Sequence, residues 1–298
     1  MAGINGTTKL AGVIGWPLSH TLSPAMHNAV YRDLGLDWIY VPLAVADEVG
    51  LRRLVAAVRS MNFVGFNVTM PYKTAILDLC DEVATAAQMA GAVNTVHCSG
   101  DKLIGYNTDG RGMLEALERD AGFDPAGKRV AILGAGGAAG GAFVALILAR
   151  SASITLINRD LGRAQELVER MEAHSVNISV EALMYAEAEQ AVREADLVIN
   201  ATSVGMRPDD PCLVPAQWLS SNQVILDMVY GQQHKTALTL CGEAAGAFTL
   251  DGLGMLVCQG ATAVDIWNES SQERTPREVM LDAARRELQS RPSVGEAR

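Results

Sequence analysis

The sequence lacks a long apolar run, and its longest apolar stretch extends only from Phe143 to Ala149. A helix that crosses a bilayer needs about 20 such residues. The apolar run around Val13 is also shorter than the core of a secretory signal peptide, which takes about 7–15 residues. These absences predict a soluble protein located in the cytoplasm.

Cysteine and histidine are scarce, with five residues of each in the chain. The cysteines are odd in number and form no Cys-x-x-Cys pair, which favours reduced thiols over a disulfide framework. The histidines show no His-Glu-x-x-His or comparable ligand spacing. We therefore expect no dedicated metal site.

Positive charge is in the minority, since 24 Lys and Arg face 34 Asp and Glu and give a net charge of −10. A nucleic-acid backbone or an anionic membrane surface would be repelled on average, so we expect neither as a partner. The 298 residues, 49% hydrophobic and 19% charged, predict a globular protein of two domains. The sequence leaves a monomer and a homodimer both open.

Short apolar runs alternate with segments of helical period, which is typical of α/β domains with largely parallel sheets. The first series predicts strands at 10–15, 39–42 and 65–68, and helices at 24–34 and 49–60. The second series predicts strands at 129–133, 153–157, 197–200, 224–228 and 248–250, and a helix at 138–150. We expect the chain to cross between the domains near 105–112 and to return near 252–254, and we expect a last helix at 279–288.

A glycine-rich loop follows the first strand of the second series and precedes a helix. This is the context that the Gly-x-Gly-x-x-Gly/Ala fingerprint of dinucleotide-binding domains requires. Glycine lets backbone N–H groups approach a pyrophosphate, which then lies at the positive end of the helix dipole. The alternative is close packing of strand and helix without a ligand. The predicted cofactor-binding residues of this loop are Gly134, Ala135, Gly136, Gly137 and Ala138.

A polar cluster follows the next strand, with Asn158, Arg159 and Asp160 in succession and Arg163 one helical turn later. An NAD site places an acidic residue here for the ribose 2′-hydroxyl, whereas an NADP site offers cations to the 2′-phosphate. The arginines favour NADP, with an ordinary solvated helix start as their alternative. Asp160 favours NAD unless it points aside or pairs with an arginine. We predict NADP, with use of both cofactors as the alternative.

Three more segments are polar where a predicted strand meets a loop, namely Ser19 to Pro24, Asn67 to Lys73 and Asn107 to Gly110. Ligands of open α/β sheets bind outside the carboxyl ends of the strands, so these hydroxyl, amide, ammonium and carboxylate groups suit a polyol or carboxylate substrate. Each segment alone is also explained by helix capping or turn formation, with Ser23 as a helix cap and Asp109 in a turn or as a cap.

Taken together, nine motifs between Ala11 and Gln259 resemble the shikimate dehydrogenase family. They are His20-x-x-Ser23-Pro24, Asn67-Val68-Thr69-x-Pro71-x-Lys73, Ala90-Gly91-Ala92-Val93-Asn94-Thr95, Asn107-Thr108-Asp109-Gly110, Gly134-Ala135-Gly136-Gly137, Asn158-Arg159, Asn200-Ala201-Thr202-Ser203, Asp227-Met228-Val229-Tyr230 and Asp251-Gly252-Leu253-Gly254-Met255-Leu256-Val257-x-Gln259. The resemblance implies an oxidoreductase of aromatic amino acid (chorismate) biosynthesis that interconverts shikimate and 3-dehydroshikimate with NADP. It also implies a Rossmann-type NADP-binding domain over 110–252 and a discontinuous α/β substrate-binding domain over 1–109 and 253–298.

The resemblance further implies a catalytic pair, Lys73 and Asp109. The alcohol carbon releases hydride only as its hydroxyl loses a proton, so a positioned acid/base is needed. An ammonium with an ordinary pKa of about 10.4 is a poor base at neutral pH, but in the reductive direction it can donate to the forming alkoxide. Asp109 would orient Lys73 and bind a substrate hydroxyl. The alternative is an exposed salt bridge of little worth.

The same resemblance assigns the other contacts. It implies that Thr21 and Ser23 hold the substrate carboxylate, while hydroxyl or carboxylate contacts come from Asn67, Thr69, Asn94, Tyr230 and Gln259. It places Met228 and Gly252 at the nicotinamide and Thr202 at the cofactor ribose or pyrophosphate.

One residue departs from the family pattern, because family members usually carry serine where this chain has Thr21. The added methyl group restricts the side-chain rotamer near the position where the extra hydroxyl of quinate must fit. Two alternatives therefore stay open: a quinate/shikimate dehydrogenase that uses NAD or both cofactors, and a non-catalytic NADP-binding sensor.

Overall fold

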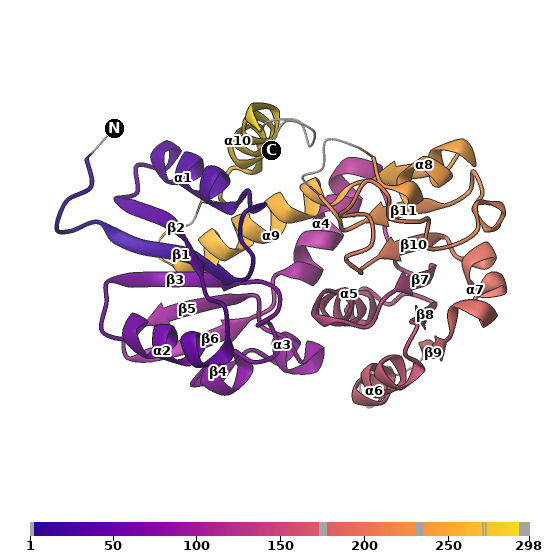
Figure 1. The fold of residues 1–298 in the computed structure, drawn as a ribbon, viewed down its shortest axis with the longest axis horizontal. Coiled ribbons are helices and arrows are strands. Elements are labelled where there is room, and N and C mark those ends of the chain that lie inside the picture. Colours follow the sequence, from indigo (N-terminus) through magenta and orange to yellow (C-terminus); the bar gives the residue numbers. More distant parts are fainter. Residues whose placement is uncertain (1–2, 173–177, 231–234, 270, 272, 292–298) are drawn as a thin grey trace. The chain divides into compact units, whose positions relative to one another are not determined.

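The computed structural model describes residues 3–172, 178–230, 235–269, 271 and 273–291 (Figure 1). His174 and His234, which entered the metal-site argument, lie outside these residues. The chain divides into two units: unit 1 comprises Met1–Thr108 and Val257–Arg298, and unit 2 comprises Asp109–Leu256. The chain thus passes from one unit to the other at 108/109 and 256/257, where the sequence predicted 109/110 and 252/253.

Unit 1 contains a six-stranded sheet with the order β2-β1-β3-β5-β6-β4. Its strands are β1 (Lys9–Gly15), β2 (Trp38–Ala44), β3 (Phe63–Val68), β4 (Glu82–Val83), β5 (Thr95–Ser99) and β6 (Lys102–Tyr106). β1 runs parallel to β2 and β3, but β5 is antiparallel to both β3 and β6. β4 runs parallel to β6, so five of the six strands share one direction, and the predicted largely parallel sheet holds for this unit except at β5, which makes the sheet mixed. A tight hairpin joins β5 to β6, whereas the parallel strands need helical crossovers.

Unit 1 has helices whose starts at 23, 48 and 277 lie close to the predicted 24, 49 and 279, and one at Thr85–Ala90 that was not predicted. They are α1 (Ser23–Asp33), α2 (Glu48–Val58), α3 (Thr85–Ala90) and α10 (Arg277–Ser290), with a short 3₁₀ turn at Leu77–Leu79. Asp47 caps α2 by accepting from the backbone N–H of Gly50 at 2.7 Å. The alternative reading of Ser23 as a helix cap does not hold, because Leu22 is the N-cap of α1 and Ser23 is already helical. α1 packs against α10, as Figure 1 shows.

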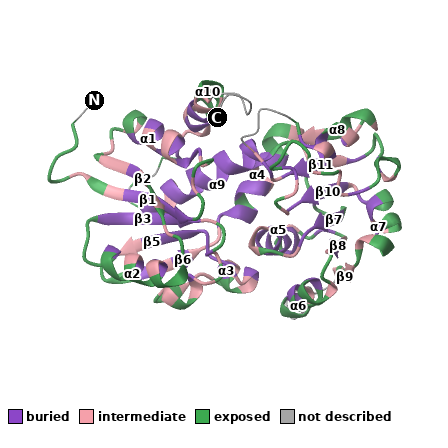
Figure 2. Ribbon diagram, viewed as in Figure 1, coloured by how far each residue is buried: buried purple, intermediate pink, exposed green. Residues whose placement is uncertain are grey.

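Apolar side chains from β1, β3 and β5 meet those of α2 in the core of unit 1. Ile14, Leu51, Phe66 and Val96 are at most 1% exposed. Full burial of such a side chain stabilises the fold by about 1.5–3 kcal/mol relative to exposure. β3 is buried along its whole length (Figure 2), so its carboxyl end is held rigidly where Asn67 begins a polar segment.

Unit 2 contains a second six-stranded sheet with the order β12-β11-β10-β7-β8-β9, and all its strands are parallel. The strands are β7 (Arg129–Leu133), β8 (Ser153–Ile157), β9 (Ser179–Leu183), β10 (Leu197–Asn200), β11 (Val224–Asp227) and β12 (Phe248–Leu250). Counted within the unit this is the order 3-2-1-4-5-6 of Rossmann domains. The predicted α/β fold class, with a Rossmann-type domain, is confirmed.

The helices of unit 2 are α4 (Asp109–Ala121), α5 (Gly137–Leu148), α6 (Leu161–Glu172), α7 (Glu189–Glu194) and α8 (Ala237–Ala244), with 3₁₀ turns at Tyr185–Glu187 and Ala216–Trp218. Asp109 is the first residue of α4, so of the turn and the helix cap considered as alternatives at this position, the structure shows a helix start. A Cβ on Gly110 would collide with the Gly141 carbonyl of α5, which explains the glycine there.

The return crossing also differs from the prediction. It lies inside the helix α9 (Gly252–Trp267), which passes from unit 2 into unit 1 without a loop. Trp267 at the end of α9 donates its indole N–H to the Val96 carbonyl of β5 at 2.9 Å. Among the described residues, no helix is both long and apolar enough to traverse a bilayer.

Candidate active site

The strand order of unit 2 reverses at β7, so the loops after β7 and β10 leave its sheet side by side, as at other ligand-binding switch points. The loop after β7 starts at Gly134, whose φ of +112° favours glycine. A Cβ there would lie 2.9 Å from Thr202 Cγ2 in the neighbouring loop. The fold itself therefore requires Gly134.

Gly136 in the same loop differs from Gly134. It is the N-cap of α5, with φ −92° and ψ −171°, a conformation open to any residue. A Cβ on Gly136 would meet no atom within 4 Å. Packing of the protein thus gives no reason for glycine here, whereas close approach of a ligand to the start of α5 does.

In the polar cluster after β8, the acidic residue Asp160 is bonded to its own neighbours. Asp160 Oδ1 accepts from the backbone N–H of Arg163 at 3.4 Å, and its Oδ2 lies 3.6 Å from Arg163 Nε. Asn158 Nδ2 donates to the Asp160 carbonyl at 2.8 Å. Asp160 is therefore engaged at the start of α6, and the neighbouring Arg159 is exposed.

The ends of β10 and β11 are joined by buried polar side chains. Asn200 Nδ2 donates to Asp227 Oδ1 at 2.8 Å, and Thr236 Oγ1 donates to Asp227 Oδ2 at 2.6 Å. Burial raises the pKa of Asp227, which these hydrogen bonds partly oppose. The hydroxyl of Thr202 donates to Asn200 Oδ1 at 2.7 Å and accepts from the Val204 N–H at 3.0 Å. The Thr202 side chain is thereby fixed within its own loop.

Two further predicted cofactor residues meet beyond β11. Met228 donates its N–H to the Asn200 carbonyl at 3.0 Å, and the Gly252 N–H donates to the Val229 carbonyl at 3.1 Å. A Cβ on Gly252 would collide with the Met228 carbonyl. Met228 and Tyr230 are half-buried. The start of α9 is thus held directly against the segment that follows β11.

In unit 1, a chain of buried amides and hydroxyls connects predicted substrate residues. Asn94 Nδ2 donates to Gln259 Oε1 at 3.2 Å and to Thr108 Oγ1 at 3.0 Å, and Asn94 Oδ1 accepts from the Thr108 N–H at 2.7 Å. Asn67 Nδ2 donates to Thr95 Oγ1 at 3.0 Å, and Thr95 Oγ1 in turn bonds Asn94 Oδ1 at 3.1 Å. We call this set of five residues the amide network.

The amide network is fixed from outside by Tyr40 on β2. Tyr40 Oη donates to Asn67 Oδ1 at 2.8 Å, and its ring stacks on His27 with centroids 4.1 Å apart. Tyr40 and His27 are both fully buried, and burial lowers the pKa of His27 to about 3. Because Tyr40 and the Asn94 carbonyl define which end of the Asn67 amide is oxygen, the orientation of that side chain is fixed.

The remaining predicted substrate residues of unit 1 lie on two loops and at the start of α1. Thr69 is half-buried and donates its N–H to the Ile14 carbonyl at 2.8 Å. Lys73 is also half-buried, and its carbonyl accepts from the Val93 N–H at 2.8 Å. Thr21 Oγ1 accepts from the N–H of Ser23 at 3.2 Å. Asp109, 5% exposed, is the first residue of unit 2.

Comparison with known proteins places this arrangement in a family. The model of the shikimate dehydrogenase substrate binding domain matches residues 13–96, and the shikimate / quinate 5-dehydrogenase model matches residues 116–206. A relative from Methanopyrus kandleri, shikimate dehydrogenase (NADP(+)), is 42% identical over 286 residues, 94% of this chain and 96% of its own. The chain belongs to the shikimate dehydrogenase family.

Two solved structures of the family are similar along most of the chain. Shikimate 5-dehydrogenase from Listeria monocytogenes, in complex with shikimate and NAD, has a TM-score of 0.86 at 36% identity and covers 95% of this chain and 98% of its own. Shikimate 5-dehydrogenase from Thermus thermophilus, in complex with NADP(H) and shikimate, has a TM-score of 0.80 at 35% identity and covers 93% and 99%.

Sequence reasoning missed several residues that hold the predicted family residues in place. Thr95, Thr108 and Asp227 stand inside the family motifs but received no role of their own. Tyr40 lies in a predicted apolar strand, and no pattern around it indicates the bond to Asn67. Its role becomes visible only when β2, β1 and β3 are placed in one sheet.

Proposed function

We propose that the protein is an NADP-dependent shikimate dehydrogenase that interconverts shikimate and 3-dehydroshikimate in aromatic amino acid biosynthesis. The observation that carries the proposal is the amide network. It joins Asn94 to Gln259, 165 residues apart in the chain, through buried polar groups. A buried cluster of amides and hydroxyls is costly unless each group is bonded, and it offers directional contacts to a polyol.

The substrate is proposed to bind unit 1. Thr21 and Ser23 hold its carboxylate, and Asn67, Thr69, Asn94, Gln259 and, from unit 2, Tyr230 contact its hydroxyls or carboxylate. Asn67 already donates both amide hydrogens, to Thr95 Oγ1 and to the Asn94 carbonyl at 3.3 Å. Its oxygen keeps a second lone pair beside Tyr40, so we assign Asn67 the role of acceptor for a substrate hydroxyl.

Unit 2 is proposed to bind NADP. The residues that would hold it are Gly134, Ala135, Gly136, Gly137 and Ala138 at the pyrophosphate, Asn158, Arg159 and Arg163 at the 2′-phosphate, Thr202 at the ribose or pyrophosphate, and Met228 and Gly252 at the nicotinamide. Gly136 fits this group because its Cβ position is open. Asp160 fits because its carboxylate is paired with Arg163, which reduces repulsion of a 2′-phosphate. The Thr202 hydroxyl already donates its hydrogen to Asn200 Oδ1, so at the ribose it would act as a hydrogen-bond acceptor.

The proposed reaction uses Lys73 and Asp109 as the catalytic pair. NADP(H) supplies the hydride acceptor or donor. In the reductive direction charged Lys73 donates a proton to the oxygen of the forming alkoxide, and in the oxidative direction it takes that proton back. Asp109 orients the ammonium and binds a substrate hydroxyl.

The proposal also covers the roles of the two units, the location of the enzyme and its oligomeric state. Unit 1 is the substrate-binding domain and unit 2 the NADP-binding domain, and the enzyme works in the cytoplasm as a monomer or homodimer on a small-molecule substrate. The family model matched over 13–96, described as a substrate-binding domain, supports this assignment.

The test is a steady-state assay of the purified protein with shikimate or quinate crossed against NADP or NAD, followed by the absorbance of the reduced nicotinamide. We expect the highest kcat/KM for shikimate with NADP. Highest efficiency for quinate with NAD would replace the proposal with the quinate/shikimate alternative, which Thr21 and Asp160 motivate. No turnover in any combination would favour the non-catalytic sensor.

A further inference from the structure

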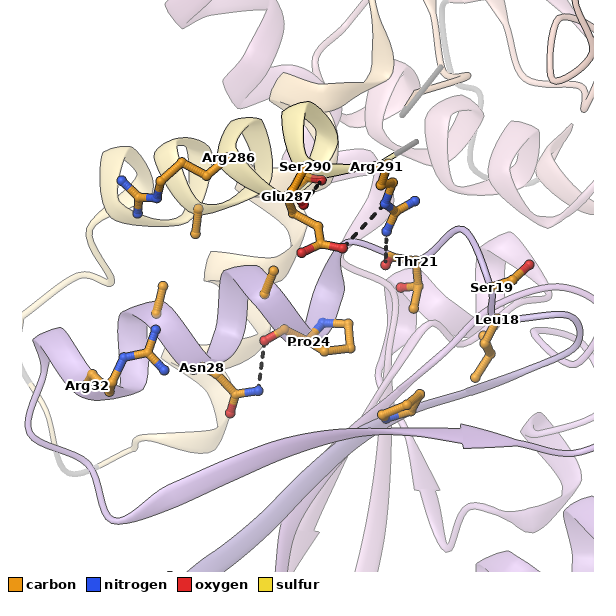
Figure 3. Close-up of a pocket in the computed structure, with 14 residues that line it drawn as sticks. Leu18, Ser19, Thr21, Pro24, Asn28, Arg32, Arg286, Glu287, Ser290 and Arg291 are labelled. Carbon is orange, nitrogen blue, oxygen red and sulfur yellow. Dashed lines mark hydrogen bonds and ion pairs between the residues drawn. The ribbon is translucent and has the colours of Figure 1, made fainter. Parts of the chain in front are cut away.

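The end of α10 reaches the loop that carries Thr21. A groove of about 750 Å³ runs between α1 and α10 in unit 1, lined by polar residues that include Ser19, Thr21 and Arg286. Figure 3 shows Arg291, the residue after α10, at one end of this groove and directed toward the loop before α1. No motif singled out Arg291.

Arg291 binds two successive backbone carbonyls of that loop. Its Nη1 donates to the His20 carbonyl at 3.0 Å and its Nη2 to the Thr21 carbonyl at 2.9 Å. Its Nε lies 3.4 Å from Glu287 Oε1, one turn earlier on α10. Because the guanidinium is planar and rigid, these three contacts fix the separation between α10 and the peptide of Thr21.

The Thr21 backbone is bonded to the residues on both sides of it, and Thr21 and Ser23 are the two residues proposed to hold the substrate carboxylate. The Thr21 N–H donates to the Leu18 carbonyl at 3.1 Å, and Thr21 Oγ1 accepts from the Ser23 N–H at 3.2 Å. Ser23 begins α1 and is 7% exposed. These bonds hold the Thr21 backbone and hydroxyl in place before a ligand arrives, and they tie the backbone of Ser23 to the Thr21 side chain.

We propose that Arg291 is a positioning residue for the substrate carboxylate, acting through the backbone of His20 and Thr21 and not by contact with the substrate. The inference rests on the proposed function, because it takes the carboxylate to bind at Thr21 and Ser23. Binding that relies on a pre-set pair of hydroxyls weakens when the loop gains freedom, since the ligand must then order it. Hydride transfer, which occurs elsewhere on the substrate, changes little once the substrate is bound.

The experiment compares Arg291→Gln with Arg286→Gln in steady-state assays with shikimate and NADP. Arg286 lines the same groove from the same helix and is exposed, and its side chain has no hydrogen bond to the described residues. We expect Arg291→Gln to raise KM for shikimate about tenfold, with kcat and KM for NADP within about twofold of the wild type. Arg286→Gln removes the same charge and should leave all three unchanged. Arg291→Lys should restore part of the lost affinity.

A double-mutant cycle with Thr21→Ala shows whether Arg291 acts through Thr21. Within the Thr21→Ala background, Arg291→Gln should raise KM by less than about twofold, because the hydroxyl that it positions is already gone. The proposal would be overturned if the two substitutions raised KM for shikimate by independent factors that multiply in the double variant. It would also be overturned by an unchanged KM in Arg291→Gln, or by an equal rise of KM in Arg286→Gln. A fall in Tm alone would indicate a purely structural role and would also overturn it. If the wild type does not turn over shikimate, the proposed function fails first and the inference falls with it.

Discussion

In unit 1 the candidate ligand groups are side-chain amides and hydroxyls that bond to one another, whereas in unit 2 they are chiefly backbone groups of a loop built of glycine and alanine. Asn94 alone bonds Thr95, Thr108 and Gln259. Gly136 offers only its peptide groups at the start of α5. The two units therefore reach rigidity differently, through a satisfied polar network in one and through helix and strand packing in the other.

Because of this difference, amino-acid substitutions should have wider effects in unit 1 than in the glycine loop of unit 2. Loss of one member of the amide network leaves its partners buried without bonds, so its effects reach both stability and affinity and are not additive. An added methyl group in the glycine loop of unit 2 acts locally, and its effect depends on whether a protein atom or a ligand occupies the space. Substitutions can thus separate the two modes of binding.

The largest effect is expected at Lys73. Lys73→Ala should lower kcat about a thousandfold, because general acid/base catalysis contributes about 10²–10⁴-fold. The dissociation constant for NADP should remain as in the wild type, since the change lies in unit 1. Rapid-mixing or steady-state rates together with a fluorescence titration of the cofactor measure both quantities. Wild-type turnover in this variant would exclude Lys73 from catalysis.

The next largest effect is expected at Arg159, on the side-chain part of the cofactor site. Arg159→Gln should raise KM for NADP about 10- to 100-fold by removing a charged partner of the 2′-phosphate. KM for NAD, which lacks that phosphate, serves as the internal control and should change less than about twofold. An equal rise of KM for NADP and for NAD would show that Arg159 does not bind the 2′-phosphate.

A pH effect on stability is expected from the buried His27 of unit 1. Its folded-state pKa of about 3 lies below the ordinary value of 6.5, so below pH 6.5 the unfolded chain binds a proton that the folded chain refuses. Stability contributed by the neutral ring is present above that pH and is lost as the pH falls, by about 2 kcal/mol at pH 5. Urea unfolding at neutral pH and at about pH 5 measures the loss.

Two variants decide whether His27 is the cause of that loss. His27→Phe keeps an aromatic ring against Tyr40 but cannot titrate, so its stability should depend less on pH by about the same 2 kcal/mol. His20→Gln changes an exposed histidine and should behave as the wild type. An unchanged pH dependence in His27→Phe would contradict the assignment.

The smallest effect is expected at Tyr40, and a matched control is available. Tyr40→Phe removes the donor to Asn67 Oδ1, and Tyr72→Phe removes a bond of equal length, 2.8 Å, to the Val45 carbonyl. Both variants should lose about 1 kcal/mol of unfolding free energy. KM for shikimate should rise a few-fold in Tyr40→Phe alone, because only that bond supports the amide network. Equal KM values in the two variants would separate Tyr40 from the site.

The sequence alone predicts most of the parallel strands but not the antiparallel ones. The bounds of β7, β8, β10 and β12 agree with the prediction, because buried parallel strands are continuous apolar runs between polar or glycine residues. The β5–β6 hairpin was not predicted, since His97, Cys98 and Lys102 interrupt its apolar pattern. Local hydrophobicity does not report pairing with a distant strand.

The candidate site shows the same limit. Motifs predict which amides, hydroxyls and glycines gather at the ends of the strands, because each motif is local in the chain. The residues that hold them are distant: Tyr40 bonds Asn67 across 27 positions, and Arg291 bonds the His20 carbonyl across 271. Nor does the sequence show that Asp160 pairs with Arg163, which depends on how α6 begins. Such contacts follow from tertiary structure alone.

The most direct test of the division between the units is an equilibrium titration of Gly136→Ala with NADP and, separately, with shikimate. The structure has room for the added methyl group, so Tm should match the wild type. Affinity for NADP should fall at least about tenfold, because the methyl group meets the pyrophosphate, while affinity for shikimate should be unchanged. Wild-type affinity for NADP in this variant would contradict the claim that unit 2 binds its cofactor through the open backbone of this loop.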